Sequence, residues 1–180
     1  KAVKDAGIAE KTLIVFTSDN GPWTMFNEFG GTAGTLRGEK STTWEGGDRV
    51  PTIFSWPGAI APAVNDAFIH NCDVFATLAK LTGGTIRETQ AVDSLDFSGV
   101  LLRSEASKRH KYVYYHKRPM GYRSGDYKIH FETRDRTRDP ITGAKAPNDR
   151  HKTPLLFNLK NDPAEKNNLA ATQPEVVDRL

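Results

Sequence analysis

A short apolar run near the beginning of the chain limits the choice of fold more than any other feature. Residues Thr12 to Thr17 are all apolar or β-branched, with charged residues before them and the turn sequence Ser-Asp-Asn-Gly after them. Such a run is typical of a strand that is buried on both faces of a parallel sheet. The residues before it look like the end of an amphipathic helix, so the order of helix, strand and loop predicts an α/β unit.

The next part of the chain is predicted to be a long, shaped loop. Seven glycines lie from Gly21 to Gly47 with little periodicity, and loops of this length in compact domains are usually functional. A second strand is expected from Val50 to Trp56. A helix is expected from Asp73 to Leu81, with Asp73 as its N-cap and two glycines after its end.

After about residue 105 the pattern changes to short strands. They are expected at residues 112–116, 121–123, 127–131 and 155–159, with a hairpin turn at 124–126. Pro174 begins a C-terminal helix, and the charged residues 132–153 are interpreted as a flexible excursion. The predicted fold class is α/β: part of a mixed or parallel sheet with flanking helices, then a small antiparallel sheet with a C-terminal helix. The predicted domains are 1–105 and 106–180.

Charge and composition argue against several classes of protein. Lys and Arg number 25 and Asp and Glu 22, which gives a net charge of +3. The richest basic stretch, residues 134–139, alternates both signs, which favours a solvated loop over a nucleic-acid-binding surface. No apolar stretch is long enough to span a bilayer, so neither a nucleic-acid partner nor a transmembrane segment is expected. The single cysteine, Cys72, excludes an internal disulfide.

Two segments carry candidate ligand-binding residues. Asp19 and Asn20 follow the first strand directly, at the edge of an open α/β sheet where ligands collect, and their oxygens suit calcium or magnesium better than zinc. The alternative is that these residues only form a turn. Lys40 lies in a glycine-framed loop, where its ammonium can neutralise an anion beside a divalent cation. The alternative for Lys40 is an ordinary exposed lysine.

Several blocks of sequence, in the same order, resemble the sulfatase family. They are Thr-Ser-Asp-Asn-Gly-Pro at 17–22, Leu-Arg-Gly-Glu-Lys at 36–40, Trp-Glu-Gly-Gly-Asp-Arg-Val-Pro at 44–51, Trp-Pro-Gly at 56–58, the helix at 73–81, Arg-Ser-Gly-Asp-Tyr-Lys at 123–128 and the segment 156–169. Together they cover nearly the whole chain. They resemble the second half of the alkaline-phosphatase-like catalytic domain and the C-terminal subdomain of these enzymes, and several blocks in order are more specific than any one.

This resemblance implies a sulfuric ester hydrolase that acts on aryl or carbohydrate sulfates. It makes Asp19 and Asn20 calcium ligands, with magnesium as the alternative ion, and it makes Lys40 a contact of the sulfate group. The implied partners are a sulfated small molecule or glycan and the remainder of the catalytic domain. The resemblance also implies export to the periplasm, the lysosome or the medium, although these residues alone do not indicate a localisation.

The nucleophile of the family does not occur in these residues. Sulfatases use a formylglycine made within a Cys/Ser-x-Pro-x-Arg motif, and no segment of the 180 residues matches that motif. Cys72 lacks both the Pro and the Arg, and it is interpreted as a small buried residue at a helix start. The formylglycine is expected in a preceding segment, so this chain alone is predicted to be inactive.

Two other functions stay open at the level of the sequence. One is a phosphate or phosphonate ester hydrolase of the same superfamily, because such esters need similar charge stabilisation. The other is a non-catalytic, sulfatase-like binding module. The histidines His110, His116, His130 and His151 show no metal-binding spacing and are interpreted as structural. His116 and Tyr122 are further candidates for lining the substrate entrance.

Overall fold

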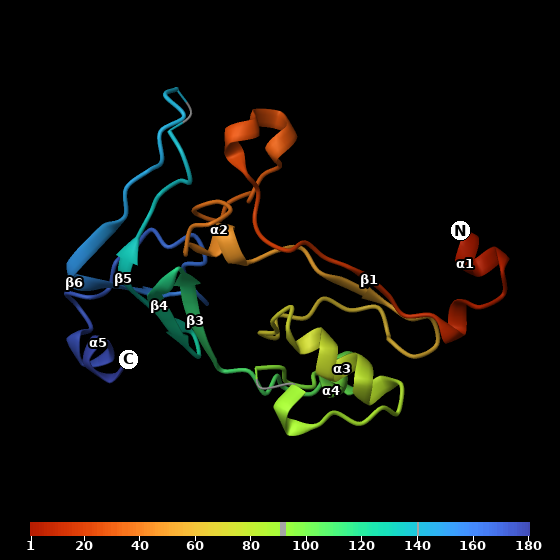
Figure 1. Ribbon diagram of the computed structural model, residues 1–180. Helices are drawn as coiled ribbons and strands as arrows, with labels where there is room; N and C mark the ends of the chain where they lie inside the picture. The colour runs from red at the N-terminus through yellow and green to blue at the C-terminus, as the bar shows by residue number, and fades with distance from the viewer. Residues whose placement is uncertain (91–92, 140) are drawn as a thin grey trace. The chain divides into compact units, whose positions relative to one another are not determined.

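The chain forms two compact units in a computed structural model, which describes residues 1–90, 93–139 and 141–180 (Figure 1). One unit contains Lys1–Thr17 and Pro51–His110, and the other contains Ser18–Val50 and Lys111–Leu180. The glycine-rich loop therefore belongs with the C-terminal sheet rather than with the strands that flank it in sequence. The predicted domain boundary after residue 105 stays a prediction. Among the described residues, no helix combines the length and the apolar character that crossing a bilayer requires.

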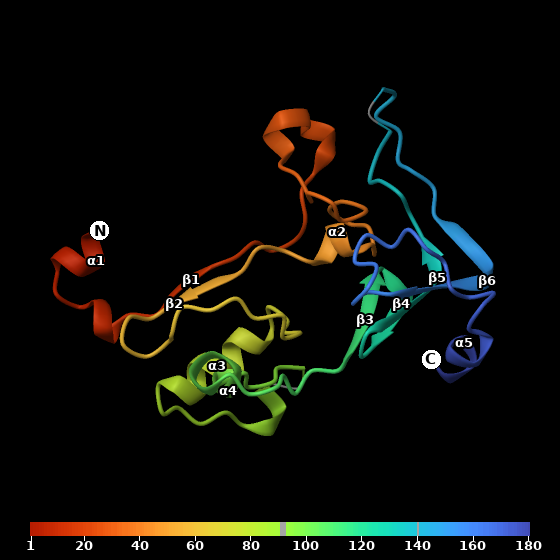
Figure 2. The same cartoon turned by 180° about the vertical axis from the view of Figure 1, so that it is seen from behind.

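The first unit contains a pair of short strands and two packed helices (Figure 2). Its elements are α1 (Ala2–Asp5), the 3-10 turn η1 (Ala9–Lys11), β1 (Ile14–Phe16), β2 (Ile53–Ser55), α3 (Asp73–Leu81), the 3-10 turn η3 (Glu88–Gln90) and α4 (Ser98–Arg103). The ring centroids of Phe54 and Phe97 lie 5.3 Å apart. Strand β2 therefore packs against the residue that precedes α4.

The first strand forms where the apolar run predicts it, but its pairing differs. Strand β1 pairs with β2 in the antiparallel direction, with Val15 opposite Phe54. Three apolar side chains of this pair remain exposed: Ile14 at 48%, Phe16 at 63% and Ile53 at 59%. The prediction of a parallel strand buried on both faces is therefore wrong for the described residues. An apolar run shows a preference for burial, but it does not encode the direction of the neighbouring strand.

Helix α3 begins and ends at the predicted residues. Its first residue is Asp73, and its N-cap is Cys72, which makes no capping bond with its side chain, so the prediction of Asp73 as the N-cap is wrong. The buried carboxylate of Asp73 instead accepts backbone hydrogen bonds from His70 and Leu95, at 2.8 Å each. This side chain joins the segment before the helix to a segment well after it.

The second unit contains a four-stranded antiparallel sheet in the order β3-β4-β5-β6. The strands are β3 (Lys111–His116), β4 (Arg118–Ser124), β5 (Tyr127–Thr133) and β6 (Asp149–Asn158). The hairpin between β4 and β5 is confirmed, and Gly125 in its turn has a φ of 59°, which glycine adopts readily. The pairing of β5 with β6 extends to Thr133 opposite Asp149. The interpretation of 132–153 as a flexible excursion is therefore wrong at both ends, because the polar start of β6 shows no apolar period.

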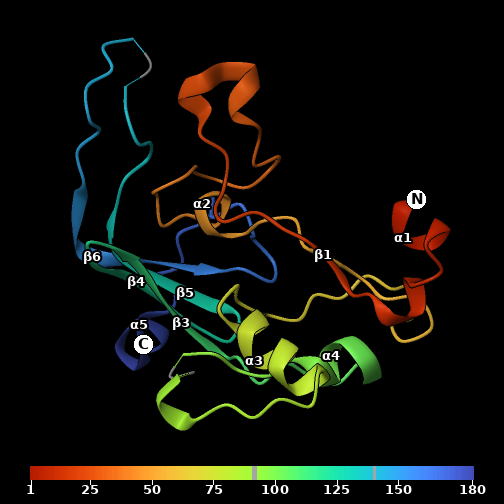
Figure 3. The same ribbon diagram turned by 45° about the vertical axis from the view of Figure 1, so that its right-hand side comes forward.

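The two faces of this sheet pack against different segments of the same unit (Figure 3). Helix α5 (Pro174–Arg179) covers one face. The buried core beneath it consists of Ile129, Leu156, Ala170 and Val176. Lys128 and His130 alternate with the core residue of β5 and point to the other face. There they contact residues 21–47, which we call the glycine loop. This loop contains the 3-10 segment η2 (Thr24–Gly30) and the short helix α2 (Glu45–Asp48). The predicted mixed α/β chain with a small antiparallel sheet and a C-terminal helix is confirmed.

Candidate functional site

The candidate site consists of two loop segments, residues 18–22 and 36–47, that are joined by backbone hydrogen bonds. The N–H of Lys40 donates to the carbonyl oxygen of Pro22 at 2.8 Å, and the N–H of Gly21 donates to a carbonyl oxygen of the second segment at 2.8 Å. A Cβ atom at Gly21 would overlap a backbone carbonyl oxygen of that segment, so this approach requires glycine. The two predicted metal ligands and the predicted sulfate-binding lysine therefore lie on adjoining segments.

Asp19 and Lys40 keep their charges available for a ligand. Within the described ranges, neither side chain forms an ion pair. The exposed carboxylate of Asp19 accepts one hydrogen bond, from Ser18 Oγ at 3.4 Å. The Nζ atom of Lys40 lies 5.4 Å from the centroid of the Trp23 ring. The neighbouring carboxylate of Glu39 is buried and accepts hydrogen bonds from two backbone N–H groups and from the Thr24 hydroxyl, so its oxygens are already occupied.

The oxygen atoms of this site fit part of a calcium shell. The carboxylate of Asp19 and the amide of Asn20 are hard oxygen donors, which calcium and magnesium prefer. Calcium takes about six to eight such oxygens. No group of three or more His, Cys, Asp or Glu side chains suited to a metal ion occurs in the part of the chain that the structure describes. Asp19 and Asn20 therefore offer oxygen ligands of the kind that calcium prefers, but fewer of them than a complete calcium site needs.

A buried charged cluster attaches the second loop segment to the sheet. The Nζ atom of Lys128 lies 2.9 Å from Glu45 Oε1 and 3.0 Å from Glu165 Oε1. The Tyr114 hydroxyl donates to Glu45 Oε1 at 2.7 Å, and His130 Nε2 donates to Glu165 Oε1 at 2.7 Å. Glu45, the most exposed of the five, is 3% exposed. Because Glu45 belongs to α2 and Lys128 to β5, this ion pair connects the glycine loop directly to the sheet.

The protonation of this cluster follows from its burial and its neighbours. Burial alone would raise the pKa of Glu45, but the Lys128 ammonium and the Tyr114 hydroxyl together hold this pKa below its ordinary value. Burial lowers the pKa of His130 to about 4, with Lys128 acting in the same direction and Glu165 in the opposite one. At neutral pH the cluster therefore contains an ionised Glu45 and a neutral His130.

We expect the stability of this unit to fall as the pH is lowered from about 6.5 to about 4. Over that window His130 takes up a proton in the unfolded chain but not in the folded one, so protons favour unfolding. His130→Gln should flatten the slope of unfolding free energy against pH by up to about 1.4 kcal/mol per pH unit, measured by urea denaturation between about pH 6 and 5. His110→Gln, at an exposed histidine of the other unit, is the control. A flattening as large in the control would contradict the prediction.

Residues 36–47 are called the Lys40 segment below. His116 lies near this segment in the structure, and Tyr122 does not. The buried guanidinium of Arg134 donates through Nη2 to the carbonyl oxygen of Ser41, and the same Nη2 lies 3.2 Å from His116 Nε2. Burial and the charge of Arg134 lower the pKa of His116. Tyr122 packs against the apolar core beneath α5, on the opposite face of the sheet.

Neither the buried charged cluster nor the role of Arg134 was predicted from the sequence. Glu45, Lys128 and Glu165 each lie in a block that resembles the sulfatase family, which was the available signal. The alternation along β5 also predicts that Lys128 and His130 share a face. A linear sequence does not show that charged residues are buried, because such residues are usually exposed.

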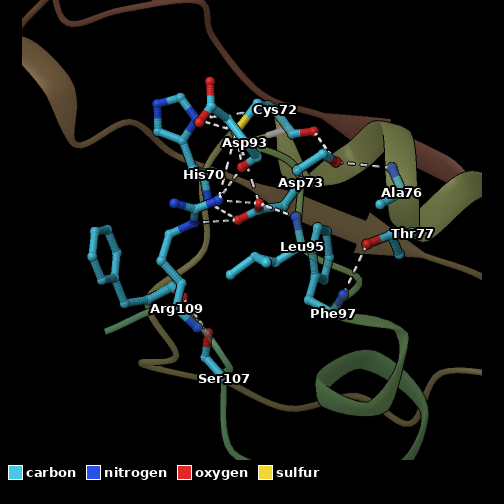
Figure 4. Close-up of polar contacts among 12 residues, drawn as sticks. His70, Cys72, Asp73, Ala76, Thr77, Asp93, Leu95, Phe97, Ser107 and Arg109 are labelled. Atoms are coloured by element: carbon cyan, nitrogen blue, oxygen red, sulfur yellow. Dashed lines mark hydrogen bonds and ion pairs between the residues drawn. The ribbon is translucent and has the colours of Figure 1, made fainter. Parts of the chain in front are cut away.

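Cys72 belongs to a separate polar cluster in the first unit (Figure 4). Its Sγ lies 2.9 Å from His70 Nδ1, and Arg109 binds the Asp73 carboxylate through Nε at 2.8 Å and Nη2 at 2.5 Å. Arg109 Nη2 also donates to the carbonyl oxygen of Asp93 at 2.6 Å. Burial and the Asp73 carboxylate raise the pKa of the Cys72 thiol, and burial lowers the pKa of His70. A thiolate–imidazolium pair is therefore disfavoured, and the cluster holds the chain around α3 together.

Comparisons with known proteins give matches that cover nearly the whole chain. The sulfatase family model matches residues 1–85, and the model of the C-terminal region of aryl-sulfatase matches residues 107–180. Arylsulfatase A of Bos taurus is 41% identical over 187 residues, which cover 98% of this chain and 37% of the relative. A solved sulfatase structure from Pseudoalteromonas sp. superimposes with a TM-score of 0.86 at 31% identity, covering 98% of this chain and 36% of that one.

A second solved structure comes from Bacteroides thetaiotaomicron, from a core genetic locus for the metabolism of multiple glycosaminoglycans. It superimposes with a TM-score of 0.79 at 30% identity, covering 99% of this chain and 39% of that one. The two family models and these relatives define the class of protein. The chain belongs to the sulfatase family, and it spans little more than a third of the length of the relatives that it matches.

Proposed function

We propose that this chain supplies the metal-binding and sulfate-binding loop of a sulfatase that hydrolyses aryl or carbohydrate sulfate esters. The observation that carries the proposal is the backbone pairing between the Lys40 segment and the segment of Asp19 and Asn20. An unpaired ammonium and an unpaired carboxylate on adjoining segments, within the described residues, suit an anion and the cation that accompanies it.

Each residue has a separate role in this proposal. Asp19 and Asn20 hold calcium, with magnesium as the alternative, and the remaining oxygen ligands come from outside these residues. A bound divalent cation supplies charge stabilisation to the ester group. Lys40 contacts a sulfate oxygen, orients the ester and offsets the negative charge that its oxygens carry. His116 lies at the edge of this region as a neutral hydrogen-bond acceptor for Arg134. Tyr122, on the other face of the sheet, is left out.

The relatives favour a sulfate ester over a phosphate or phosphonate ester, since those that the chain matches are named arylsulfatases and sulfatases. The glycosaminoglycan locus of one structural neighbour favours a carbohydrate sulfate. Export, and a remaining part of the catalytic domain that carries the formylglycine, belong to the same proposal. Because the 180 residues contain no formylglycine motif, they are expected to bind a sulfate ester without turning it over.

We expect Lys40→Ala to weaken the binding of 4-nitrophenyl sulfate by about tenfold, which corresponds to about 1.4 kcal/mol for one charged contact. Isothermal titration calorimetry in the presence of calcium measures this affinity. Asp19→Asn should make the affinity independent of calcium. Lys152→Ala removes the same charge at an exposed position of β6 and is the matched control. Equal affinity in the native chain and in Lys40→Ala would refute the proposed role of this lysine.

A further inference from the structure

Two aromatic side chains at the start of η2, those of Trp23 and Phe26, lie beside the Lys40 segment, and we call them the aromatic pair. Their ring centroids lie 4.9 Å apart and their planes meet at 88°, which is an edge-to-face arrangement. Trp23 is half-buried, whereas Phe26 is 51% exposed. Trp23 therefore supports the Phe26 ring on one side, and part of the Phe26 ring stays open to solvent.

The backbone directly after Phe26 has an unusual conformation. Asn27 has a φ of 50° and a ψ of −128°, which interrupts η2. Residues other than glycine rarely adopt such a conformation, and those that do are concentrated at binding and active sites. In an unbroken 3-10 helix, side chains three residues apart share a face. The kink at Asn27 therefore separates Phe29 from the aromatic pair.

Hydrogen bonds attach the aromatic pair to the Lys40 segment. The N–H of Thr24 donates to Glu39 Oε2 at 3.0 Å, and the Thr24 hydroxyl donates to the same oxygen. The N–H of Trp23 donates to the carbonyl oxygen of Gly30 at 3.0 Å, which closes the base of η2. A Cβ atom at position 30 would lie 2.0 Å from the Trp23 carbonyl oxygen, so this closure requires glycine. Because Glu39 is buried and directly precedes Lys40, the aromatic pair has a fixed place beside this lysine.

The ammonium of Lys40 faces the aromatic pair. Its Nζ atom lies over the Trp23 ring, 5.4 Å from the ring centroid, which is within the range of about 6 Å for a cation–π contact. The N–H of Lys40 donates to the carbonyl oxygen of Pro22, the residue before Trp23, at 2.8 Å. In a sulfate ester, a single bridging oxygen joins the sulfur to the carbon of the alcohol. An ester whose sulfate contacts Lys40 therefore has its alcohol part close to the Trp23 ring.

We propose that the aromatic pair is a subsite for a ring in the alcohol part of the sulfate ester, which stacks on the open part of the Phe26 ring. The inference rests on the proposed function, because it takes the sulfate group to lie at Lys40. Phe26 offers a flat apolar surface, and the complementary chemistry is the flat face that aryl and pyranose rings share. An open-chain alkyl sulfate has no such face, so this subsite favours cyclic esters.

The test uses three sulfate esters, titrated into the whole chain in the presence of calcium and followed by nuclear magnetic resonance of the ligand. The aryl ester is 4-nitrophenyl sulfate, the pyranose ester is glucose 3-sulfate, and methyl sulfate has no ring. Phe26→Ala should weaken binding of at least one ring-bearing ester by about three- to tenfold and leave methyl sulfate unchanged. The ester that loses more affinity identifies the ring. Phe29→Ala removes the same side chain from an 89% exposed position of η2, and it should change each affinity by less than about twofold.

The outcomes separate this inference from the proposed function. Equal weakening of methyl sulfate by Phe26→Ala would overturn the subsite, and so would unchanged affinities for both ring-bearing esters. If Lys40→Ala weakens all three esters while Phe26→Ala changes none, the proposed function stands and the subsite falls. The reverse pattern retains the subsite and removes the role of Lys40. An absence of binding of every ester by the native chain removes both.

Discussion

Lys128→Met should lower the unfolding free energy of the antiparallel unit by about 3–5 kcal/mol. The lysine is fully buried, and its Nζ contacts the carboxylates of Glu45 and Glu165 and lies 3.7 Å from the centroid of the Tyr114 ring. Methionine has a similar volume but no charge, so the substitution leaves two buried carboxylates without their common cation. Urea denaturation followed by circular dichroism measures the change.

Two further variants make this prediction specific. Lys152→Met introduces the same side chain at an exposed position of β6 and should change stability by less than about 0.5 kcal/mol. Adding Glu165→Gln to Lys128→Met should recover part of the loss, because it removes one of the two uncompensated charges. A loss below about 1 kcal/mol in Lys128→Met would show that water reaches the cluster. No recovery in the double variant would show that packing, rather than charge, causes the loss.

Trp44→Ala should cost about 3–5 kcal/mol, the usual range for deleting a buried aromatic side chain. Trp44 is completely buried between the glycine loop and the sheet. Its ring centroid lies 4.5 Å from that of His130 and 5.8 Å from that of Phe157, and the guanidinium carbon of Arg37 lies 3.6 Å from it. The substitution removes these contacts at once and leaves a cavity where the loop meets the sheet.

The same variant has a functional consequence that separates it from general destabilisation. Under native conditions it should also weaken 4-nitrophenyl sulfate binding, because the loop that carries Lys40 loses its apolar attachment to the sheet. Phe29→Ala is the control, since Phe29 belongs to the same loop and is 89% exposed. It should leave both stability and binding near their native values. Native-like stability in Trp44→Ala would mean that the loop is held by the charged cluster alone.

Much of the local structure was predictable because short-range patterns report it directly. The extent of α3 and the alternation in β5 follow from side-chain periods of 3.6 and 2 residues. The hairpin between β4 and β5 follows from the turn residues Ser124-Gly125-Asp126. The direction of β1 relative to β2 was not predictable, because both directions place the same side chains on the same faces. The start of β6 was missed because its exposed residues are polar.

The candidate site was predictable only as a set of residue types. Asp19, Asn20 and Lys40 were identified from their chemistry and from the family resemblance, and their roles remain proposals. The burial of Arg134 was not predicted, because residues 134–139 alternate both signs, a pattern typical of a solvated loop. In the fold Asp135 pairs with Arg37, while the Arg134 side chain is buried and donates to the carbonyl oxygen of Ser41.

The amino-acid sequence alone determined the family, the local elements and the residues with chemical potential, because these depend on residue types and short spacings. The three-dimensional arrangement determined which charges are buried and which form ion pairs. Lys128 is more than 30 residues from Glu45 and from Glu165 in the chain, yet its Nζ atom lies 2.9 Å and 3.0 Å from their carboxylates. Whether a charge is neutralised depends on such distances and on the exclusion of water. Neither can be read from the order of residues in the sequence.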